Sequence, residues 1–274
     1  MNDRIINKKD LLDKLFVEWR ARMEKDGEHH FTEDGLLYKN DKTIEQTESE
    51  WQHSTKRVLF LLKDQNQKGD DKWDEDIRYW LKDRSVDRPQ ELENKRKNRE
   101  LANSFIKCLA YQFWGIIKAD LENDWWYEEV EMHHEEVVEL FNTLPFAFVE
   151  CKKMPGEGNL RASILNRHLR DYGSFLKQEI EILNPNIIVC TSQQSYDFVL
   201  KMYPNELIGL DGNMNFRYHP DKQLLIIYSL HPSARKSNKG IYDDFMYHYR
   251  LYIHHQSELI QAQDHLMFRK VNNF

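Results

Sequence analysis

Four short apolar segments constrain the fold of this chain more than any other feature, because each ends abruptly in polar residues. They span residues 58–62, 146–151, 186–191 and 224–230. Runs of this length with such ends are typical of strands that are buried on both faces, as in a parallel sheet. Longer charged and periodic stretches, typical of helices, separate them. The alternation predicts a three-layer α/β/α fold with a mostly parallel central sheet.

The remaining segments can be placed around these strands. Helical periodicity predicts helices over residues 11–23, 92–118, 128–142, 160–183, 194–202 and 241–256. Weaker patterns predict edge strands over residues 207–210 and 216–219. Residues 28–50 are polar and are expected to form a loop or a short hairpin. We therefore expect a helical N-terminal extension over residues 1–50 and one α/β domain over residues 51–274.

Composition and motifs argue against several classes of protein. The longest apolar runs are far shorter than the ~20 residues of a membrane span, and the charged N-terminus is unlike a signal peptide. The cysteines show no Cys-x-x-Cys spacing, the paired histidines show no metalloenzyme spacing, and no glycine-rich phosphate loop occurs. We expect a soluble cytoplasmic protein with no metal and no organic cofactor. Its oligomeric state stays open.

Charge is distributed unevenly along the chain. The 39 Lys and Arg residues against 46 Asp and Glu residues give a net charge of −7, which argues against a protein that coats nucleic acid. Two segments are nevertheless basic, residues 151–170 and residues 233–239. Two such segments on an acidic protein favour a focused anionic ligand, although a solvated surface is the simpler explanation for either segment alone.

The strand ends indicate where a ligand site is expected. In open α/β sheets, ligands bind beyond the carboxyl ends of the strands. The residues that follow the four strands are 64–66, 150–159, 191–193 and 231–236. In the last group, Pro232 directly follows His231, and its fixed backbone directs the imidazole over the edge of the sheet. The simpler alternative is a turn that happens to contain a histidine.

Three motifs follow one another in an informative order. They are Val149–Asn159 with its Pro-Gly pair, Asn184-Pro-Asn-Ile-Ile-Val189, and His231-Pro-Ser-Ala234. This order resembles the uracil-DNA glycosylase superfamily, whose members end their last core strand in His-Pro-Ser. The similarity extends over roughly residues 58–250. The resemblance implies the α/β/α fold of that family.

The resemblance also implies a reaction. Members of the family flip a base out of the DNA stack and cleave its N-glycosidic bond. His231 matches the histidine that hydrogen-bonds a carbonyl group of the base and stabilises the anionic leaving group. Asp64 falls where the best-known branch has its water-orienting aspartate. The alternative for Asp64 is a residue that ends the strand by hydrogen-bonding the turn.

Two motifs depart from the family pattern. Residues 62–66 read Leu-Lys-Asp-Gln-Asn, where the family has a glycine first and a proline fourth, so the loop is expected to follow a different path. Glu150 stands where the family has a base-reading asparagine. An ionised Glu150 only accepts hydrogen bonds, whereas a protonated Glu150, with its pKa raised by burial, mimics an amide. A structural ion pair with Lys152 or Lys63 is the alternative for Glu150.

Further contacts with DNA follow from the same resemblance. The candidates for phosphate or DNA contacts are Ser233, Arg235, Lys236, Lys153 and Asn159. The candidates for base contacts besides Glu150 are Asn66, Trp73 and Tyr79, with Trp80 beside them. An aromatic side chain that stacks on a base contributes about 1–3 kcal/mol. Tryptophans at helical spacing are also typical of a hydrophobic core, which is the alternative for Trp73 and Trp80.

The expected function is hydrolytic removal of a damaged or deaminated base, with DNA as the partner. A non-catalytic module with the same fold, which binds nucleic acid or a protein, is the main alternative. The altered first motif and the acidic net charge favour that alternative. An enzyme that acts on a free nucleotide or nucleoside is a third possibility, because it needs less basic surface.

Overall fold

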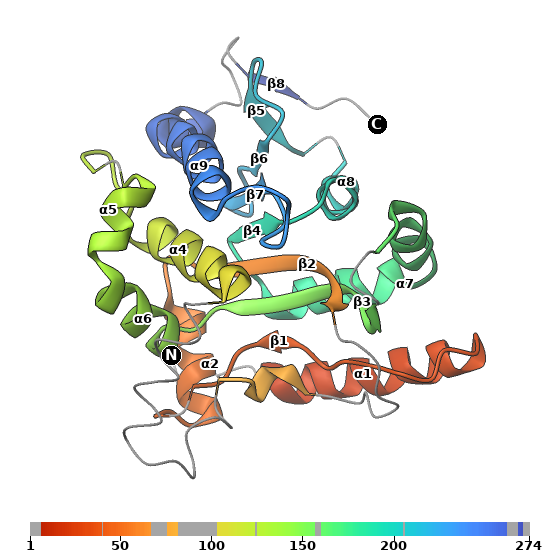
Figure 1. Ribbon diagram of the computed structural model, residues 1–274. Coiled ribbons are helices and arrows are strands. Elements are labelled where there is room, and N and C mark those ends of the chain that lie inside the picture. The colour runs from red at the N-terminus through yellow and green to blue at the C-terminus, as the bar shows by residue number, and fades with distance from the viewer. Residues whose placement is uncertain are drawn as a thin grey trace, which may run out of the picture. The chain divides into compact units, whose positions relative to one another are not determined.

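The computed structural model describes residues 7–39, 41–66, 76–81, 103–123, 125–156, 160–204, 206–261 and 268–270. Two compact units, each made from two stretches of chain, divide the protein. Unit 1 comprises residues 1–86 and 145–185, and unit 2 comprises residues 87–144 and 186–274. Figure 1 shows the helices and strands with their labels.

Unit 1 is built around three strands. Its described elements are α1 (Lys8–Lys25), β1 (Gly35–Leu36), α2 (Ile44–His53), β2 (Val58–Asn66), the 3-10 helix η1 (Ile77–Tyr79), β3 (Ala147–Gly156) and α7 (Ala162–Leu183). Strand β3 lies in the middle, antiparallel to β1 and parallel to β2. The parallel pair β2 and β3 therefore has its two carboxyl ends at the same edge.

Helix α1 belongs to the hydrophobic core of unit 1. It packs against α7, and its Trp19 ring stacks on Phe175 of α7 with the centroids 5.5 Å apart. The buried apolar side chains of α1 are Leu12, Leu15, Phe16, Trp19 and Met23. This spacing is that of one helix face, as predicted. The described part of residues 1–50 thus packs within unit 1, and the division into an extension over residues 1–50 and one domain over residues 51–274 stays a prediction.

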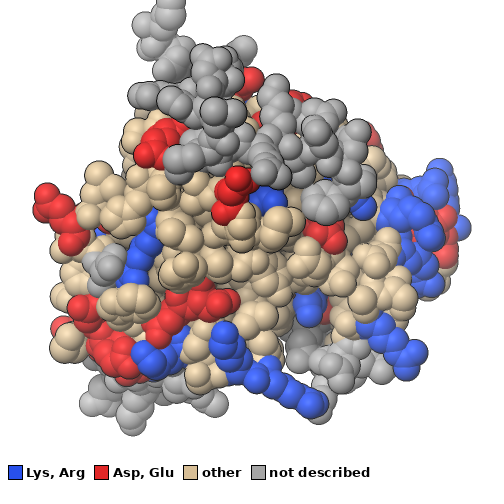
Figure 2. All heavy atoms as spheres, turned by 90° about the horizontal axis from the view of Figure 1, so that it is seen from above, with Lys and Arg blue, Asp and Glu red and all other residues tan. Residues whose placement is uncertain are grey.

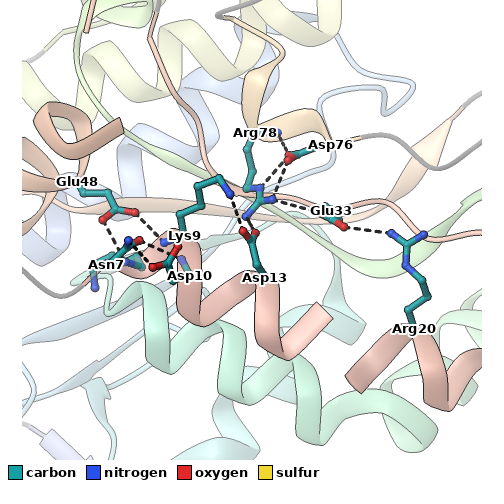
Figure 3. Close-up of polar contacts among 10 residues, drawn as sticks. Asn7, Lys9, Asp10, Asp13, Arg20, Glu33, Glu48, Asp76 and Arg78 are labelled. Carbon is teal, nitrogen blue, oxygen red and sulfur yellow. Dashed lines mark hydrogen bonds and ion pairs between the residues drawn. The ribbon is translucent and has the colours of Figure 1, made fainter. Parts of the chain in front are cut away.

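Arg78 ties α1 to the residues around η1 (Figure 3). Its side chain is 1% exposed and contacts the carboxylates of Asp13 at 2.7 Å, Glu33 at 2.8 Å and Asp76 at 2.7 Å. Glu48 of α2 accepts hydrogen bonds from backbone N–H groups in the first turn of α1. These ion pairs hold their partners in one arrangement, because loss of the carboxylates would leave the buried Arg78 guanidinium without a partner.

Helix α2 corrects one prediction. Residues 28–50 were expected to form a loop or hairpin, but residues 44–53 are helical. The Thr43 side chain accepts a hydrogen bond from the backbone N–H of Gln46, and the Gln46 side chain accepts one from the backbone N–H of Thr43. This reciprocal pair is a capping box. The Thr-x-x-Gln spacing is the sequence signal that identifies it.

Unit 2 contains the other predicted strands. Its described elements are α4 (Ser104–Lys118), α5 (Tyr127–Met132), α6 (His134–Thr143), β4 (Ile187–Cys190), α8 (Gln193–Met202), β5 (Ile208–Leu210), β6 (Phe216–His219), β7 (Leu224–Tyr228), α9 (Asn238–Gln261) and β8 (Phe268–Lys270). Strands β4 and β7 are parallel. Strands β7, β6, β5 and β8 follow in antiparallel pairs.

Helices α8 and α9 cover opposite faces of these strands (Figure 1). Phe216 of β6 contacts Tyr252 of α9, whereas Tyr228 of β7 contacts Tyr196 of α8. Phe216 is paired with Ile227, the neighbour of Tyr228. Because successive side chains of a strand point to opposite faces, Tyr228 and Phe216 face opposite sides. Unit 2 is therefore layered as helix, sheet and helix.

One predicted helix is divided in the structure, and another is described only in part. The helix expected over residues 128–142 is divided into α5 and α6 at His133. The helix expected over residues 92–118 is described only from Ser104, with Asn103 as its N-cap. In the part of the chain that the structure describes, no helix has both the length and the apolar character needed to cross a membrane.

Candidate functional site

A tight turn after β7 carries His231. The backbone N–H of Ser233 donates to Nδ1 of His231 at 3.1 Å, and the backbone N–H of Ala234 donates to the His231 carbonyl at 2.7 Å. Pro232 between them is buried. Because Nδ1 accepts a hydrogen bond, a neutral imidazole here carries its proton on Nε2. The turn therefore presents His231 as an N–H donor.

Phe105 lies against the imidazole and was not identified from the sequence. Its ring centroid is 5.9 Å from that of His231, and the two planes are tilted by 46°. The Asn103 side chain accepts a hydrogen bond from the Phe105 backbone N–H and so starts α4 at this point. The Asn-Ser pair at 103–104 is a helix N-cap signal, and it would have placed Phe105 in a first turn. Phe105 is thus the aromatic ring beside the predicted catalytic histidine.

Hydrogen bonds between two helix starts hold this region together. The Ser104 hydroxyl donates to Oδ1 of Asn238, at the start of α9, at 2.7 Å. The Asn238 amide in turn donates to the Ser104 carbonyl at 3.2 Å. The segment from His231 to the start of α9 is therefore anchored at both ends, by its own turn and by α4.

Three of the predicted phosphate contacts are exposed on this segment. Ser233, Arg235 and Lys236 are all exposed to solvent. Lys239, one turn further on, instead forms ion pairs with Glu128 at 2.7 Å and Asp243 at 2.9 Å. The exposed hydroxyl and cations before α9 are therefore the groups of this segment that suit an anionic ligand.

Asp64 lies near the end of β2 in unit 1. Its side chain is 11% exposed, and its Oδ2 is 3.7 Å from Nζ of Lys152 on β3. That Oδ2 is buried and has no hydrogen-bond partner among the described residues. Burial raises the pKa of Asp64, and the charge of Lys152 opposes the rise. The Lys152 ammonium is thus the ionic neighbour of Oδ2, and no described residue donates a hydrogen bond to that oxygen.

Gly156 provides the space that Asp64 occupies. A Cβ atom at position 156 would overlap Oδ2 of Asp64. The Lys152 ammonium also donates to the carbonyls of Met154 and Pro155 at 2.9 and 3.0 Å, which fixes the chain before Gly156. Residues 62–66 remain in the strand, with Asn66 paired to Gly156. The first motif is therefore part of β2, with a register shift between Asp64 and Asn66, and the difference between its path and that of the family's loop stays a prediction.

Glu150 shares a face of the sheet with Asp64. Leu62 is paired with Glu150 and Asp64 with Lys152, and residues two apart on a strand point the same way. Glu150 is 3% exposed, and its Oε2 has no hydrogen-bond partner in the described ranges. Burial raises its pKa well above the usual value, and the carboxylates of Asp34 and Asp64 add to the rise. These surroundings favour the neutral acid.

Lys153 occupies the opposite side of β3 and is fully buried. Its ammonium forms ion pairs with Asp34 and, at 2.7 Å, with Glu179 of α7. It also lies over the rings of Phe16 and Trp19. Burial lowers the pKa of Lys153, but the two carboxylates outweigh this effect and raise it. The ammonium is enclosed in the core, so it is not available to a DNA phosphate.

The predicted aromatic contacts are described in part. The Tyr79 ring is 5.2 Å from that of Tyr38, and the Trp80 ring is 6.3 Å from that of Phe148, two residues before Glu150. The Asn66 side chain, Trp73 and Asn159 lie outside the described part of the chain. Tyr79 is therefore packed with another aromatic residue of unit 1, and its contact with a base stays a prediction.

The predicted residues form two local groups, one in each unit. Asp64 and Glu150 belong to unit 1, whereas His231 belongs to unit 2 together with Phe105. Within the described ranges, no three His, Cys, Asp or Glu side chains gather in a way that suits a metal ion. The carboxyl groups of Asp64 and Glu150 and the imidazole of His231 are able to form hydrogen bonds, transfer protons and stabilise charge.

Comparison with known proteins identifies a family. A family model described as the uracil DNA glycosylase superfamily matches residues 96–250, more than half of the 274-residue chain. No curated protein matches the chain. The matched range includes Phe105, Glu150 and His231, whereas Asp64 precedes it. The match confirms the predicted three-layer α/β/α fold with a mostly parallel central sheet.

Proposed function

The chain belongs to the uracil-DNA glycosylase superfamily, and from that premise we propose that it hydrolyses the N-glycosidic bond of a damaged or deaminated base flipped out of DNA. The observation that carries the proposal is the hydrogen bond from the Ser233 backbone to Nδ1 of His231, which leaves Nε2 as a donor. A base leaves more readily as its anion when such a donor faces the carbonyl oxygen on which charge develops.

Asp64 is the proposed residue that orients the attacking water. Its ionised carboxylate accepts a hydrogen bond from the attacking water. It also stabilises the positive charge that develops on the sugar as the bond to the base breaks. The position of Asp64 near the end of β2 supports this role, and the charge of Lys152, 3.7 Å from Oδ2, favours the ionised carboxylate. The role requires ionised Asp64, so activity is expected to fall as the pH falls through a pKa raised by burial.

The remaining contacts hold the nucleotide. We place Phe105 as the ring on which the base stacks, since it adjoins His231. Ser233, Arg235 and Lys236 contact the flanking phosphates. Figure 2 shows Lys and Arg side chains in several separate groups, and some of these groups adjoin Asp and Glu side chains. Binding through a few local cations therefore suits the proposal better than a broad basic surface.

A strand-scission assay tests the proposal. Oligonucleotides that carry uracil, hypoxanthine or xanthine are incubated with the protein and then treated with alkali, which cleaves abasic sites. We expect scission with at least one base, and a loss of about 100- to 1,000-fold in the rate for His231→Ala, as for other donors to a developing anion. His254→Ala removes an exposed histidine of α9 and is the matched control.

Two outcomes would reject the hydrolase. One is no scission with any of the three bases, in both single- and double-stranded oligonucleotides. The other is equal scission by the His231→Ala and wild-type proteins, because a contaminating enzyme would then be the source. Release of the free base, measured by chromatography, confirms which bond is broken.

A non-catalytic module is the second candidate, because the family match begins after Asp64. Such a module would bind oligonucleotides without scission. Binding to duplex DNA weakens steeply as salt is added, whereas binding of a free nucleoside hardly responds. Titrations at several salt concentrations therefore distinguish a DNA partner from a nucleoside substrate.

A further inference from the structure

Arg217 of β6 is a buried cation of unit 2 that the proposed function does not use. The residue is 5% exposed. Its Nη1 donates hydrogen bonds to the carbonyls of Asn213 and Phe216, both at 2.7 Å. Its Nη2 donates one to Sδ of Met214 at 3.2 Å. In the part of the chain that the structure describes, none of its polar partners is a carboxylate. A buried charge is unfavourable unless it is paired, so this guanidinium lacks the negative charge that would balance it.

The edge of this guanidinium that is formed by Nε and Nη2 holds no oxygen acceptor. Nε is buried and has no hydrogen-bond partner among the described residues. Nη2 contacts the Met214 thioether, and sulfur is a weak acceptor. The two N–H groups of such an edge are parallel and match two oxygens of one phosphate or carboxylate group. The edge of Arg217 that suits an oxyanion best therefore faces a thioether instead.

The neighbouring residues fix Arg217 in this position. A Cβ atom at position 209 of β5 would lie 3.0 Å from Nη1 of Arg217 and 3.1 Å from its Cδ, so Gly209 leaves the room that this side chain occupies. The Tyr196 hydroxyl of α8 donates to the Met214 carbonyl at 3.0 Å and holds the turn beside the guanidinium. A binding site requires groups that are positioned in this way by their surroundings. The guanidinium is therefore held in place before any ligand arrives.

Met214 covers this edge with a side chain that is able to move. It is 59% exposed, although it is apolar, and it belongs to the turn between β5 and β6. Methionine is unbranched and adapts its shape readily, so a change of rotamer takes the sulfur away from Nη2 while the backbone stays in place. The same turn lies at the carboxyl end of β7, because the Tyr228 N–H donates to the Asn215 carbonyl at 2.7 Å. Ligands of open α/β sheets bind beyond such strand ends.

We propose that Arg217 binds a terminal phosphate group in place of the Met214 thioether. Nε and Nη2 donate to two of the phosphate oxygens, and the phosphate supplies the negative charge that balances the buried guanidinium. A terminal phosphate carries a charge of about −1.5 to −2 at pH 7, more than the single charge of a carboxylate. A phosphodiester within a strand has a sugar on both sides, so it does not reach a residue that is 5% exposed. This inference does not rest on the proposed function.

Titration calorimetry with inorganic phosphate at constant ionic strength tests this site. Arg217→Lys keeps the charge but lacks the parallel N–H groups. We expect it to weaken phosphate binding by about 10- to 100-fold, the effect of lost charged hydrogen bonds. Met214→Ala removes the covering side chain and should lower Kd, because the fraction of molecules that are competent to bind rises. Lys201→Met removes an exposed cation of α8 in the same unit and should keep the wild-type Kd.

Further ligands distinguish the sources of such a phosphate group. A nucleoside 5′-monophosphate, and an oligonucleotide with and without a 5′-phosphate, are titrated in the same way, and the tightest phosphate ligand identifies the source. Four results would overturn the inference: no phosphate binding by the wild-type protein, equal Kd values for Arg217→Lys and wild type, acetate binding as tight as that of phosphate, or loss of phosphate binding in Lys236→Met.

A second variant keeps the test decisive if Arg217→Lys does not fold, which circular dichroism would show. Met214→Ala then decides, and a Kd for phosphate that is no lower than that of wild type overturns the inference. None of these measurements uses strand scission, so their result is independent of the proposed function.

Discussion

The two groups of candidate residues differ in how they are held. In unit 1, Asp64 of β2 and Glu150 of β3 are largely enclosed, and the charges of Lys152 and Lys153 of β3 act on them. In unit 2, His231 sits on a turn fixed by backbone hydrogen bonds, beside exposed side chains. One group depends on burial and charge, and the other depends on local backbone geometry.

This difference teaches what each group can do. Enclosure shifts the pKa of both carboxyl groups upward, which makes their proton occupancy sensitive to their surroundings. The turn around His231 fixes a tautomer, and the residue is half-buried rather than enclosed. We expect substitutions in the first group to affect stability and pH dependence, and those in the second to affect rate and binding.

The largest expected effect breaks the charge balance of unit 1. Lys153→Met leaves Asp34 and Glu179 enclosed without their cation. Removal of one partner from a buried ion pair costs about 3–5 kcal/mol. Urea unfolding should show a loss of this size, whereas exposed Lys236→Met should change the free energy of unfolding by less than about 0.5 kcal/mol. Equal free energies of unfolding for Lys153→Met and Lys236→Met would contradict the difference that we describe between the enclosed group of unit 1 and the exposed turn of unit 2.

A smaller effect is expected at the histidine turn. Phe105→Ala removes the ring that adjoins His231 and should lower kcat/KM for a modified oligonucleotide by about 10- to 100-fold, equivalent to the 1–3 kcal/mol of one stacked base. Phe105→Trp keeps a stacking surface and serves as the control. Rates for Phe105→Ala that equal wild type would mean that the base stacks elsewhere, with Tyr79 as the next residue to test.

The smallest expected effect is a shift of the pH–rate profile, which tests whether Asp64 acts in its ionised form. Because the charge of Lys152 lowers the pKa of Asp64 against the effect of burial, Lys152→Met should raise that pKa further. The acid limb of the pH–rate profile should then move to higher pH, since the proposed role needs ionised Asp64. Lys152→Arg keeps the charge and should leave the limb in place. If the acid limb of the pH–rate profile stays in place in Lys152→Met, a group other than Asp64 is responsible for that limb.

Local sequence patterns were sufficient for much of the fold. The strands at residues 58–62, 146–151, 186–191 and 224–230 are all present, because each depends on its own apolar run and polar end. The helices α7, α8 and α9 and the strands β5 and β6 were also predicted, but the prediction of edge strands was wrong, because β6 pairs with both β7 and β5 and β5 pairs with both β6 and β8. The family match confirms the resemblance that began with His231-Pro-Ser.

Tertiary contacts account for what the sequence did not reveal. Lys153 lies in a basic segment that suggested phosphate binding, but Asp34 and Glu179, more than twenty residues away on either side, enclose it. Phe105 looked like one apolar residue within a longer helix, and only the start of α4 at Ser104 places it beside His231. Such partners are distant in the sequence, so no local pattern specifies them.

Because position 156 is a glycine, its sequence is expected to vary together with that of position 64. Oδ2 of Asp64 fills the volume that a Cβ atom at position 156 would need, so a larger residue at 156 requires the Asp64 side chain to move or to be replaced by a smaller one. Related sequences are therefore expected to keep the aspartate and the glycine together or to lose them together.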